Sequence, residues 1–360
     1  MSTESRPFDT LAQLLESGGL KLSILDMGRR VCVIPHETFV SFERTLTCYP
    51  YPLQQQAWFA LCLHDPVHPE MDPIIWFLHF PLDEQAKLLQ SARDDFLHRL
   101  MDNLADQRLE STRDSGLDTA LQDNPYLFQP RKERLAILHA RLTQRLGNPP
   151  SRYYEHARAY LGGALSWDQW AFIGYQGIAD VAARLASDPQ LQQIADAIEA
   201  LPPAPLEALC HCLENSAVPE EISAALLARI KAELERDTPD PQVLSAGIRG
   251  IAQSTSDIIR NKLIIEILSD DISIRSDLLV SIAGRAWEAL RDPVLRNLFL
   301  ERMAVNEAGE AFFNAVLSDL LYLPDTRPLL QSSLRQAERS EALSLAIGRF
   351  FAHVKAPQSA

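Results

Sequence analysis

One short segment gathers the side chains that could bind a metal ion. It contains His64, Asp65 and His68, and Glu70, Asp72 and His79 lie nearby in the sequence. Imidazoles and carboxylates are ligands of zinc and other divalent ions, so the segment could support a metal-dependent enzyme such as a hydrolase. A hairpin loop whose residues cap turns would use the same side chains, and their spacing matches no established ligand pattern. A metal-dependent enzyme centred on His64, Asp65 and His68 is therefore the alternative function.

A second set of metal-ligand residue types, Cys210-His211-Cys212, has the wrong spacing for a single ion. On a helix, side chains two positions apart point about 200° away from each other, so these three cannot converge. Cys210 also belongs to an apolar stripe, where a thiol behaves as a small hydrophobic group. This pattern favours a structural role for the two cysteines.

The established catalytic motifs are missing from the sequence. It contains no G-x-G-x-x-G or G-x-x-x-x-G-K-[ST] loop for a nucleotide and no G-x-S-x-G nucleophile elbow. The adjacent carboxylates Asp83-Glu84 and Asp94-Asp95 fit helix capping and a solvated face better than acid–base catalysis. We therefore expect no catalytic residue, no metal site and no cofactor, which favours a non-catalytic protein over an enzyme.

Polar residues that flank the expected strands are the candidates for contact with a partner. Asp26, Arg29 and Arg30 follow one strand, and Asp83 and Glu84 follow another. Charged side chains at such positions can contact a second protein, whereas turn and cap formation would use them within the chain. The predicted partner-binding residues are Asp26, Arg29, Arg30, Asp83 and Glu84.

The first third of the chain predicts a small sheet that would position these residues. Four strands in meander order predict an antiparallel sheet with one buried face. A helix is expected before the sheet at 10–16, and another after it from Pro81 to about Leu104. Short apolar or β-branched runs typical of strands lie at 21–28, 30–35, 56–64 and 74–80.

The remainder of the chain predicts helices at a regular period. Apolar residues recur at i, i+3, i+4 and i+7 in successive sets, whose first members are 38, 35, 34 and 30 residues apart. A second helix fits between each pair, and this period is typical of HEAT-like α-solenoids. An irregular helical bundle is the alternative. The sets begin at Leu206, Leu244, Leu279, Phe313 and Leu343.

Three Asp-Pro pairs mark where helices begin in this part, because an aspartate can cap the helix whose first residue is the proline. They lie at Asp188, Asp240 and Asp292. The polar segment 107–131 is the expected linker. The predicted fold is therefore α+β, with a small N-terminal antiparallel sheet and helices at 1–106 and an all-α HEAT-like helical-repeat domain at 132–360.

Composition and charge limit the kind of partner. The 360 residues carry 48 acidic and 34 basic side chains, and 46% are hydrophobic, which excludes a collagen, a mucin and a wholly disordered chain. The net charge of −14 counts against nucleic acid as the main ligand. A third possible function is RNA or DNA binding through a basic strip in the helical domain. Without a signal peptide or a membrane span, and with an odd number of cysteines, we expect a cytoplasmic protein that binds a protein partner.

An ordered series of short motifs adds a family resemblance. It includes Asp26-Met-Gly-Arg-Arg30, Tyr49-Pro-Tyr-Pro-Leu-Gln-Gln55, Trp76-Phe-Leu, Trp167-Asp-Gln-Trp170 and Asp180-Val-Ala-Ala-Arg-Leu185. Together these motifs resemble the family of proteins known as the domain of unknown function DUF3549. The resemblance implies that the sheet-containing and helical parts occur together as one unit, and it implies no activity and no site residue.

Overall fold

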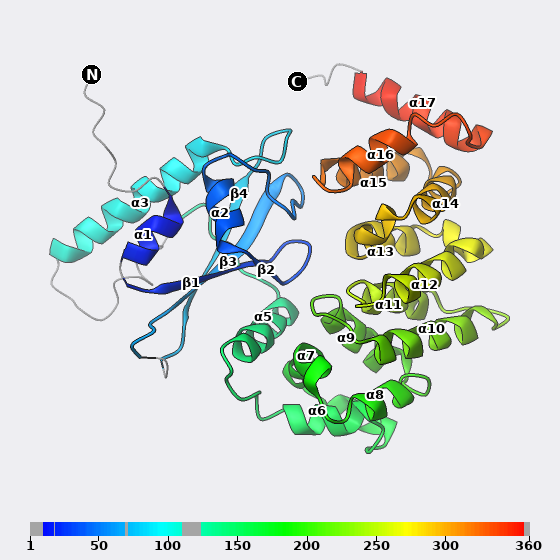
Figure 1. Ribbon diagram of the computed structural model, residues 1–360, viewed down its shortest axis with the longest axis horizontal. Coiled ribbons are helices and arrows are strands. Elements are labelled where there is room, and N and C mark those ends of the chain that lie inside the picture. Colours follow the sequence, from blue (N-terminus) through cyan, green and yellow to red (C-terminus); the bar gives the residue numbers. More distant parts are fainter. Residues whose placement is uncertain (1–9, 18, 69–70, 110–123, 356–360) are drawn as a thin grey trace. The chain divides into compact units, whose positions relative to one another are not determined.

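The computed structural model describes residues 10–17, 19–68, 71–109 and 124–355, and it separates into two compact units (Figure 1). One unit holds Met1–Arg131 with Tyr322–Pro324, and the other holds Lys132–Leu321 with Asp325–Ala360. The predicted domain boundaries, with a linker at 107–131, stay a prediction because residues 110–123 lie outside the described part.

A four-stranded antiparallel sheet forms the base of the N-terminal unit, and with the many helices that follow it confirms the predicted α+β class. The strand order is β2-β1-β3-β4, so the predicted meander order is wrong. A helix, α2, follows β2 and returns the chain to the free edge of β1, where β3 then pairs. The strands are β1 (Lys21–Asp26), β2 (Cys32–Ile34), β3 (Gln56–His64) and β4 (Ile74–Pro81).

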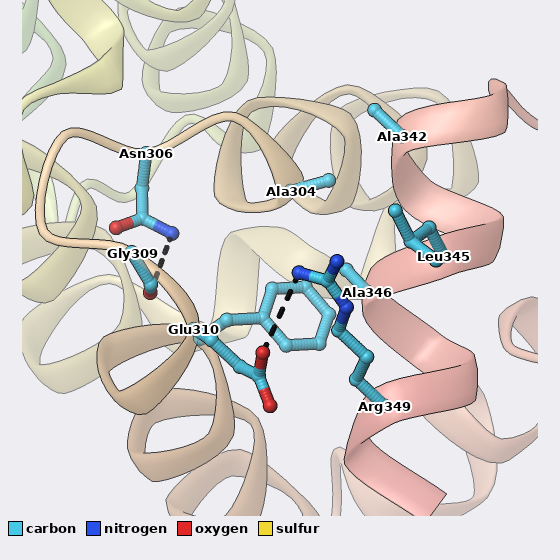
Figure 2. Close-up of a pocket in the computed structure, with 9 residues that line it drawn as sticks. Ala304, Asn306, Gly309, Glu310, Ala342, Leu345, Ala346 and Arg349 are labelled. Atoms are coloured by element: carbon cyan, nitrogen blue, oxygen red, sulfur yellow. Dashed lines mark hydrogen bonds and ion pairs between the residues drawn. The ribbon is translucent and has the colours of Figure 1, made fainter.

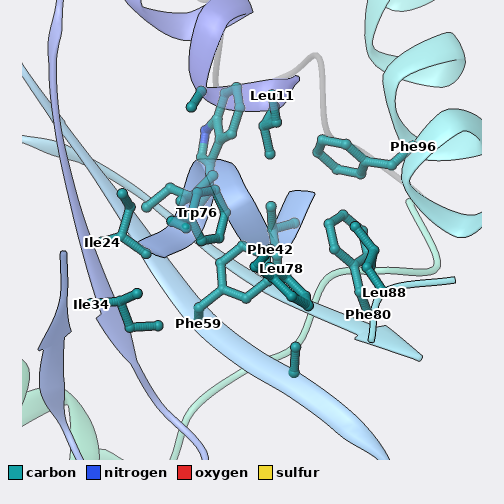
Figure 3. Close-up of a cluster of buried hydrophobic side chains, with 14 of the residues drawn as sticks. Leu11, Ile24, Ile34, Phe42, Phe59, Trp76, Leu78, Phe80, Leu88 and Phe96 are labelled. Atoms are coloured by element: carbon teal, nitrogen blue, oxygen red, sulfur yellow. The ribbon is translucent and has the colours of Figure 1, made fainter. Parts of the chain in front are cut away.

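One face of this sheet carries the core of the unit. Ile24 lies opposite Leu61 in the β1–β3 register, and Phe59 lies opposite Leu78 in the β3–β4 register. Because side chains alternate between the two faces of a strand, these four share one face. Figure 3 shows side chains from the helices and the strands converging there. The helices are α1 (Leu11–Ser17), α2 (His36–Glu43) and α3 (Gln90–Leu109).

Aromatic rings connect the helices to the sheet in this core. Phe59 of β3 meets Phe39 of α2 and Phe80 of β4 edge-on, with ring centroids 5.1 and 5.5 Å apart. Phe96 of α3 packs edge-on against Phe80 at 5.6 Å (Figure 3). Each such pair stabilises the fold by about 0.5–1.5 kcal/mol beyond the burial of its area. The rings therefore hold α2 and α3 against the sheet.

The helix that we predicted from Pro81 begins later, at Gln90. Pro81 is the last residue of β4, and the chain then makes a turn around Asp83. The Asp83 carboxylate oxygen Oδ1 accepts hydrogen bonds from the backbone N–H groups of Gln85 and Lys87, both at 2.8 Å. Asp83 thus stabilises a turn instead of a helix N-terminus, which is the local role that aspartate often has outside helices.

A buried carboxylate joins α1 to α2. Glu43, the last residue of α2, is 1% exposed, and its carboxylate accepts hydrogen bonds from the backbone N–H groups of Leu11 at 2.7 Å and Ala12 at 3.1 Å. These are the first residues of α1, whose N–H groups have no partner within the helix. Burial raises the pKa of Glu43 to about 7, although both N–H groups and Arg93 oppose the shift.

The second unit is helical. Its α-helices are α5 (Lys132–Arg145), α6 (Tyr154–Leu161), α7 (Tyr175–Arg184), α8 (Leu191–Ala197), α9 (Pro203–Leu213), α10 (Glu220–Leu234), α11 (Pro241–Ile251), α12 (Asp257–Ser269), α13 (Ser276–Arg285), α14 (Pro293–Ala304), α15 (Glu310–Tyr322), α16 (Arg327–Ser333) and α17 (Glu341–Lys355). Four short 3₁₀ helices connect some of them: η1 (Trp167–Phe172), η2 (Leu185–Ser187), η3 (Asp271–Ile274) and η4 (Trp287–Arg291).

Alternate helices of this unit stack side by side in two layers (Figure 1). One layer runs through α5, α7, α9, α11 and α13, and the other runs through α6, α8, α10, α12, α14 and α17. The predicted apolar sets lie between the layers: α9 buries Leu206 and Leu213, and α11 buries Leu244 and Ile251. The apolar stripe of each helix therefore determines which of its sides packs against the neighbouring helices.

Two of the predicted Asp-Pro helix starts are confirmed. Asp240 accepts a hydrogen bond from the backbone N–H of Gln242 at the start of α11, and Asp292 does the same for Val294 at the start of α14. Asp188 differs, because α8 begins three residues later, at Leu191. Its buried carboxylate accepts hydrogen bonds from the Gln190 backbone N–H and the Tyr154 hydroxyl instead.

Close helix contact requires glycine at one position of α7. A Cβ atom on Gly177 would lie 2.4 Å from the carbonyl oxygen of Tyr153 and 2.8 Å from the Cβ of Ala157. Tyr153 immediately precedes α6 and Ala157 lies within it, so only a residue without a side chain allows α6 and α7 to approach this closely. Gly284 of α13, by contrast, has open space where its Cβ would be.

Among the residues that the structure describes, no helix combines the length and the apolar character needed to cross a membrane.

We expect opposite effects from alanine at Gly177 and Gly284. Gly177→Ala should lower the free energy of unfolding by about 1–3 kcal/mol, because backbone atoms would have to shift. Gly284→Ala should raise it by up to about 1 kcal/mol, because alanine favours the helix and meets no neighbour. Thermal unfolding followed by circular dichroism measures both, and equal effects of the two variants would contradict the close contact at Gly177.

The raised pKa of Glu43 predicts a pH-dependent stability. Because the folded protein binds this proton more tightly than the unfolded chain, whose ordinary value is 4.5, the stabilisation is complete below about pH 4.5 and is lost as the pH rises through 7. Relative to Glu43→Gln, the free energy of unfolding of the wild type should fall by about 3 kcal/mol from pH 4.5 to 8. Urea unfolding across this range measures the difference.

Glu37→Gln is the matched control for this measurement, because Glu37 is an exposed carboxylate on the same helix. A pH dependence that persists unchanged in Glu43→Gln, or that disappears equally in Glu37→Gln, would show that another group is responsible.

Candidate functional site

Asp26, the first of the predicted partner-binding residues, lies in the interior. Its side chain at the end of β1 is fully buried, and one carboxylate oxygen is 2.7 Å from the Tyr49 hydroxyl, which donates to it. The other oxygen accepts a hydrogen bond from the Arg30 backbone N–H at 3.0 Å. The Tyr49 hydroxyl also lies 2.9 Å from the carbonyl oxygen of Trp58. Burial and the Asp26 carboxylate raise the pKa of Tyr49, so its hydroxyl stays a donor.

Arg29 and Arg30 lie in the same buried region. Arg29 is 2% exposed and Arg30 is 3% exposed. The Arg29 guanidinium donates from Nε to the carbonyl oxygen of Pro52 at 2.7 Å. With the Asp26–Tyr49 hydrogen bond, this contact fixes the turn after β1 against the loop before β3. The structure therefore brings Asp26, Arg29 and Arg30 together as an internal polar cluster.

Asp83 and Glu84 lie in the turn that precedes α3. Asp83 is half-buried and stabilises the turn, and Glu84 is exposed. The same turn contacts the Tyr49 loop, because the Tyr49 backbone N–H donates to the carbonyl oxygen of Ala86 at 2.8 Å. That these five residues contact a partner stays a prediction. Of the five, Glu84 has the most accessible side chain.

The predicted metal segment brings two of its side chains together. Nδ1 of His68 lies 2.8 Å from one oxygen of Asp65, and the other oxygen accepts a hydrogen bond from the Val67 backbone N–H at 2.8 Å. These bonds, led by that to His68, lower the pKa of Asp65. His79 stacks on Trp58 with ring centroids 4.9 Å apart. Glu70 lies outside the described residues.

No group of three or more His, Cys, Asp or Glu side chains that could hold a metal ion occurs in the described part of the chain. The metal-dependent enzyme centred on His64, Asp65 and His68 accordingly stays an untested alternative, and the observed contacts form a capped turn.

The thiols of Cys210 and Cys212 pack inside the helical unit. Both are buried, and burial raises the pKa of Cys212 to about 12 and also raises that of Cys210. His211, between them, is partly exposed and lies 3.5 Å from a carboxylate oxygen of Glu207 on the preceding turn. Neutral buried thiols are poor nucleophiles and poor metal ligands, so the structure gives these cysteines a packing role.

The structure reveals a hollow that the sequence did not indicate, where the end of α14, the start of α15 and one side of α17 meet (Figure 2). Its volume is about 210 Å³. Much of the wall is apolar, formed by Ala304, Phe313, Ala342, Leu345 and Ala346. Most ligand pockets combine an apolar wall with a few polar groups in the same way.

Polar groups also line this hollow. Glu310 and Arg349 form an ion pair across it, with a carboxylate oxygen 3.5 Å from a guanidinium nitrogen (Figure 2). The Asn306 amide nitrogen donates to the carbonyl oxygens of Met303 at 2.7 Å and Gly309 at 3.1 Å. Its amide oxygen is buried and makes no hydrogen bond with the described residues, so the hollow leaves one acceptor unsatisfied.

A second, more open hollow continues from the first along α15. Its volume is about 510 Å³, and Glu310 lines both hollows. Ala311, Ala315 and Ser318 form its floor on one face of α15, and His353 of α17 forms its far side. Asn314, also in its wall, has a buried amide oxygen without a hydrogen-bond partner in the described part. We name the two hollows together the C-terminal groove.

Sequence reasoning missed this groove because it assigned the apolar stripes of these helices wholly to the core, although Phe313, which begins one of the predicted sets, also lines the first hollow. The predicted sets at Phe313 and Leu343 are the buried stripes of α15 and α17. The available signal in the sequence was Leu345, an apolar residue outside these stripes. In the structure its side chain is 54% exposed. A single exposed leucine is common on protein surfaces, so this signal is weak without the structure.

Comparison with known proteins gives one match. A family model described as "Protein of unknown function (DUF3549)" matches residues 6–351, nearly the whole chain, and confirms the resemblance seen in the sequence motifs. No curated protein and no solved structure matches the chain.

The Asp26–Tyr49 hydrogen bond can be measured with a double-mutant cycle. Tyr49→Phe should lower the free energy of unfolding by about 1.5–3 kcal/mol, because it removes a buried hydrogen bond to a charged acceptor. In an Asp26→Ala background the same change should cost less, because the charged acceptor is gone and only the contact with the Trp58 carbonyl oxygen remains. Urea unfolding of the four proteins tests this, and additive effects would show that the two side chains do not interact.

Proposed function

The chain belongs to the family of proteins of unknown function DUF3549, and from its structure we propose that it is a non-catalytic protein-interaction protein. The helical unit would supply the binding surface. Its alternating layers support the interpretation as a HEAT-like helical repeat, in which stacked helix pairs expose long surfaces to partners. The observation that carries the proposal is the C-terminal groove.

The lining of the groove suits binding of another protein. Alanine, leucine and phenylalanine side chains form an apolar floor, and the Glu310–Arg349 ion pair borders it. Protein interfaces typically have such an apolar centre with a polar rim. The smaller hollow has room for one large apolar side chain, and the hollow along α15 would hold the segment on either side of it.

Charge and thiol chemistry support the rest of the proposal. A chain with a net charge of −14 repels the phosphates of nucleic acid, so we propose a protein partner. The five cysteines of the chain are unbridged, and Cys62 is buried with a pKa that burial raises to about 12. Unbridged thiols suit a reducing compartment, which supports a cytoplasmic location.

A bulky charged residue in the groove should block partner binding. Ala315 is exposed on α15 and lies in the floor, so Ala315→Arg would fill the groove without disturbing buried packing. Affinity capture from the native cell extract, read by mass spectrometry, should recover a stoichiometric partner with the wild type. With Ala315→Arg we expect at least a tenfold loss of that partner, about 1.4 kcal/mol of binding free energy.

Ala224→Arg is the matched control, because Ala224 is an exposed alanine in the middle of α10, away from the groove. Equal loss in both variants would remove the groove from the proposal. Absence of any stoichiometric partner, together with turnover of a metabolite by the purified wild type, would overturn the proposed function itself.

A further inference from the structure

The C-terminal groove has helices on both of its long sides. One side is the face of α17 from Ala342 to His353, and the other begins at the end of α14 and continues along α15 as far as Ser318. Figure 2 shows Glu310 of α15 and Arg349 of α17 paired across the groove. Because an α-helix rises by about 1.5 Å per residue, the α17 side is about 16 Å long, which is three helical turns.

The two hollows follow one another along the groove. On α17, the residues that line the smaller hollow centre on Ala346, whereas the more open hollow is lined by His353. The Glu310–Arg349 ion pair marks the boundary between them, because Glu310 lines both. Their centres are therefore about seven residues, or roughly 10 Å, apart along α17. Two side chains seven residues apart on another helix have the same separation and lie on one face of it.

An extended segment would fit this groove poorly because of its backbone. Its N–H and C=O groups would face a largely apolar floor, where unpaired polar groups cost free energy. The walls are helices, whose own backbone groups bond mostly within each helix, so they present no strand edge for pairing. The buried amide oxygens of Asn306 and Asn314 could accept two N–H groups at most and could satisfy no carbonyl group. A helical segment, by contrast, satisfies its backbone internally.

The helical unit itself shows how a helix is held beside others. Within the stack, α12 contacts α10 and α14 in its own layer and α11 in the other layer. At the C-terminal end of the described stack, the groove lies between α17 and the pair α14 and α15. A helix bound there would continue the same packing.

We propose that the partner presents an amphipathic helix to the C-terminal groove, with two large apolar side chains seven residues apart. The inference rests on the proposed function and names the kind of segment that the groove binds. One side chain fills the hollow beside Ala346, and the other fills the hollow beside His353. The residue midway between them lies over the Glu310–Arg349 ion pair, which favours a polar side chain there. Because the chain carries 48 acidic against 34 basic side chains, basic residues on the exposed side of the partner helix strengthen binding.

Selection of peptides on the immobilised full chain tests this inference. The probe is a display library of random peptides of about 16 residues, long enough for four helical turns. Selected peptides should carry two large apolar residues seven positions apart. Synthetic, fluorescently labelled copies should bind at least tenfold more weakly to Leu345→Arg, which fills the smaller hollow, and to Ala315→Arg, which fills the other. Proline at the middle of a selected peptide should also weaken binding at least tenfold, because it breaks the helix. Fluorescence anisotropy measures each Kd.

Val280→Arg is the matched control and should bind the peptides as the wild type does. Val280 of α13 is 47% exposed, close to the 54% of Leu345, and neither hollow of the groove includes it. The inference is overturned by peptides that need the groove but tolerate the central proline or lack the seven-residue spacing. A library that yields no peptide sensitive to Leu345→Arg overturns it as well.

The inference and the proposed function fail separately. If the selected peptides are not helical but Ala315→Arg still loses the native partner, only the inference is wrong. If helical peptides bind the groove but capture of the native partner does not change in Ala315→Arg, the proposed use of the groove is wrong.

Discussion

Each helix of the second unit can bury its apolar stripe only against helices that precede and follow it in the chain. α11 is an example, because it contacts α9 and α13 in its own layer and α10 and α12 in the other. A helix of 11 residues is marginal when isolated in water, so its stability comes from this stacking. The close approach of α6 and α7 at Gly177 has the same cause, because neighbouring helices must touch to exclude water. The helix sides that this stacking leaves over line the C-terminal groove, as on α15 and α17.

Buried carboxylates impose a comparable constraint on the N-terminal unit, because each needs hydrogen-bond donors in the interior. A carboxylate loses its hydration when it is buried, which costs free energy unless hydrogen bonds replace the water. Asp26 receives the Tyr49 hydroxyl and the Arg30 backbone N–H, and Glu43 receives two backbone N–H groups of α1. Each set of bonds forms in one geometry only. These carboxylates therefore help to specify where the turn after β1 and the helix α1 are placed.

Local sequence patterns predicted the structure correctly where the conformation of a segment depends on its own residues. Asp240 and Asp292 begin helices as predicted, because the cap and the proline act on the next few residues. The same reasoning failed at Pro81-Leu-Asp-Glu84, which has the composition of a helix start. There the chain extends β4 and then forms a turn around Asp83, and the helix begins only at Gln90. Pairing of β4 with β3 determines this outcome, since Pro81 is paired with Gln56 of the preceding strand.

The sequence by itself determined the strands, the amphipathic helices and the family, because hydrophobic period, capping residues and ordered motifs are local properties. Only the tertiary structure decided the strand order, the burial of Asp26, Arg29 and Arg30, and the existence of the C-terminal groove. These features depend on contacts between residues far apart in the chain: the Asp26 carboxylate needs the Tyr49 loop, and the groove needs α14, α15 and α17 together. Charged residues beside a strand look alike in sequence whether they face water or the interior, since their distant partners decide between the two.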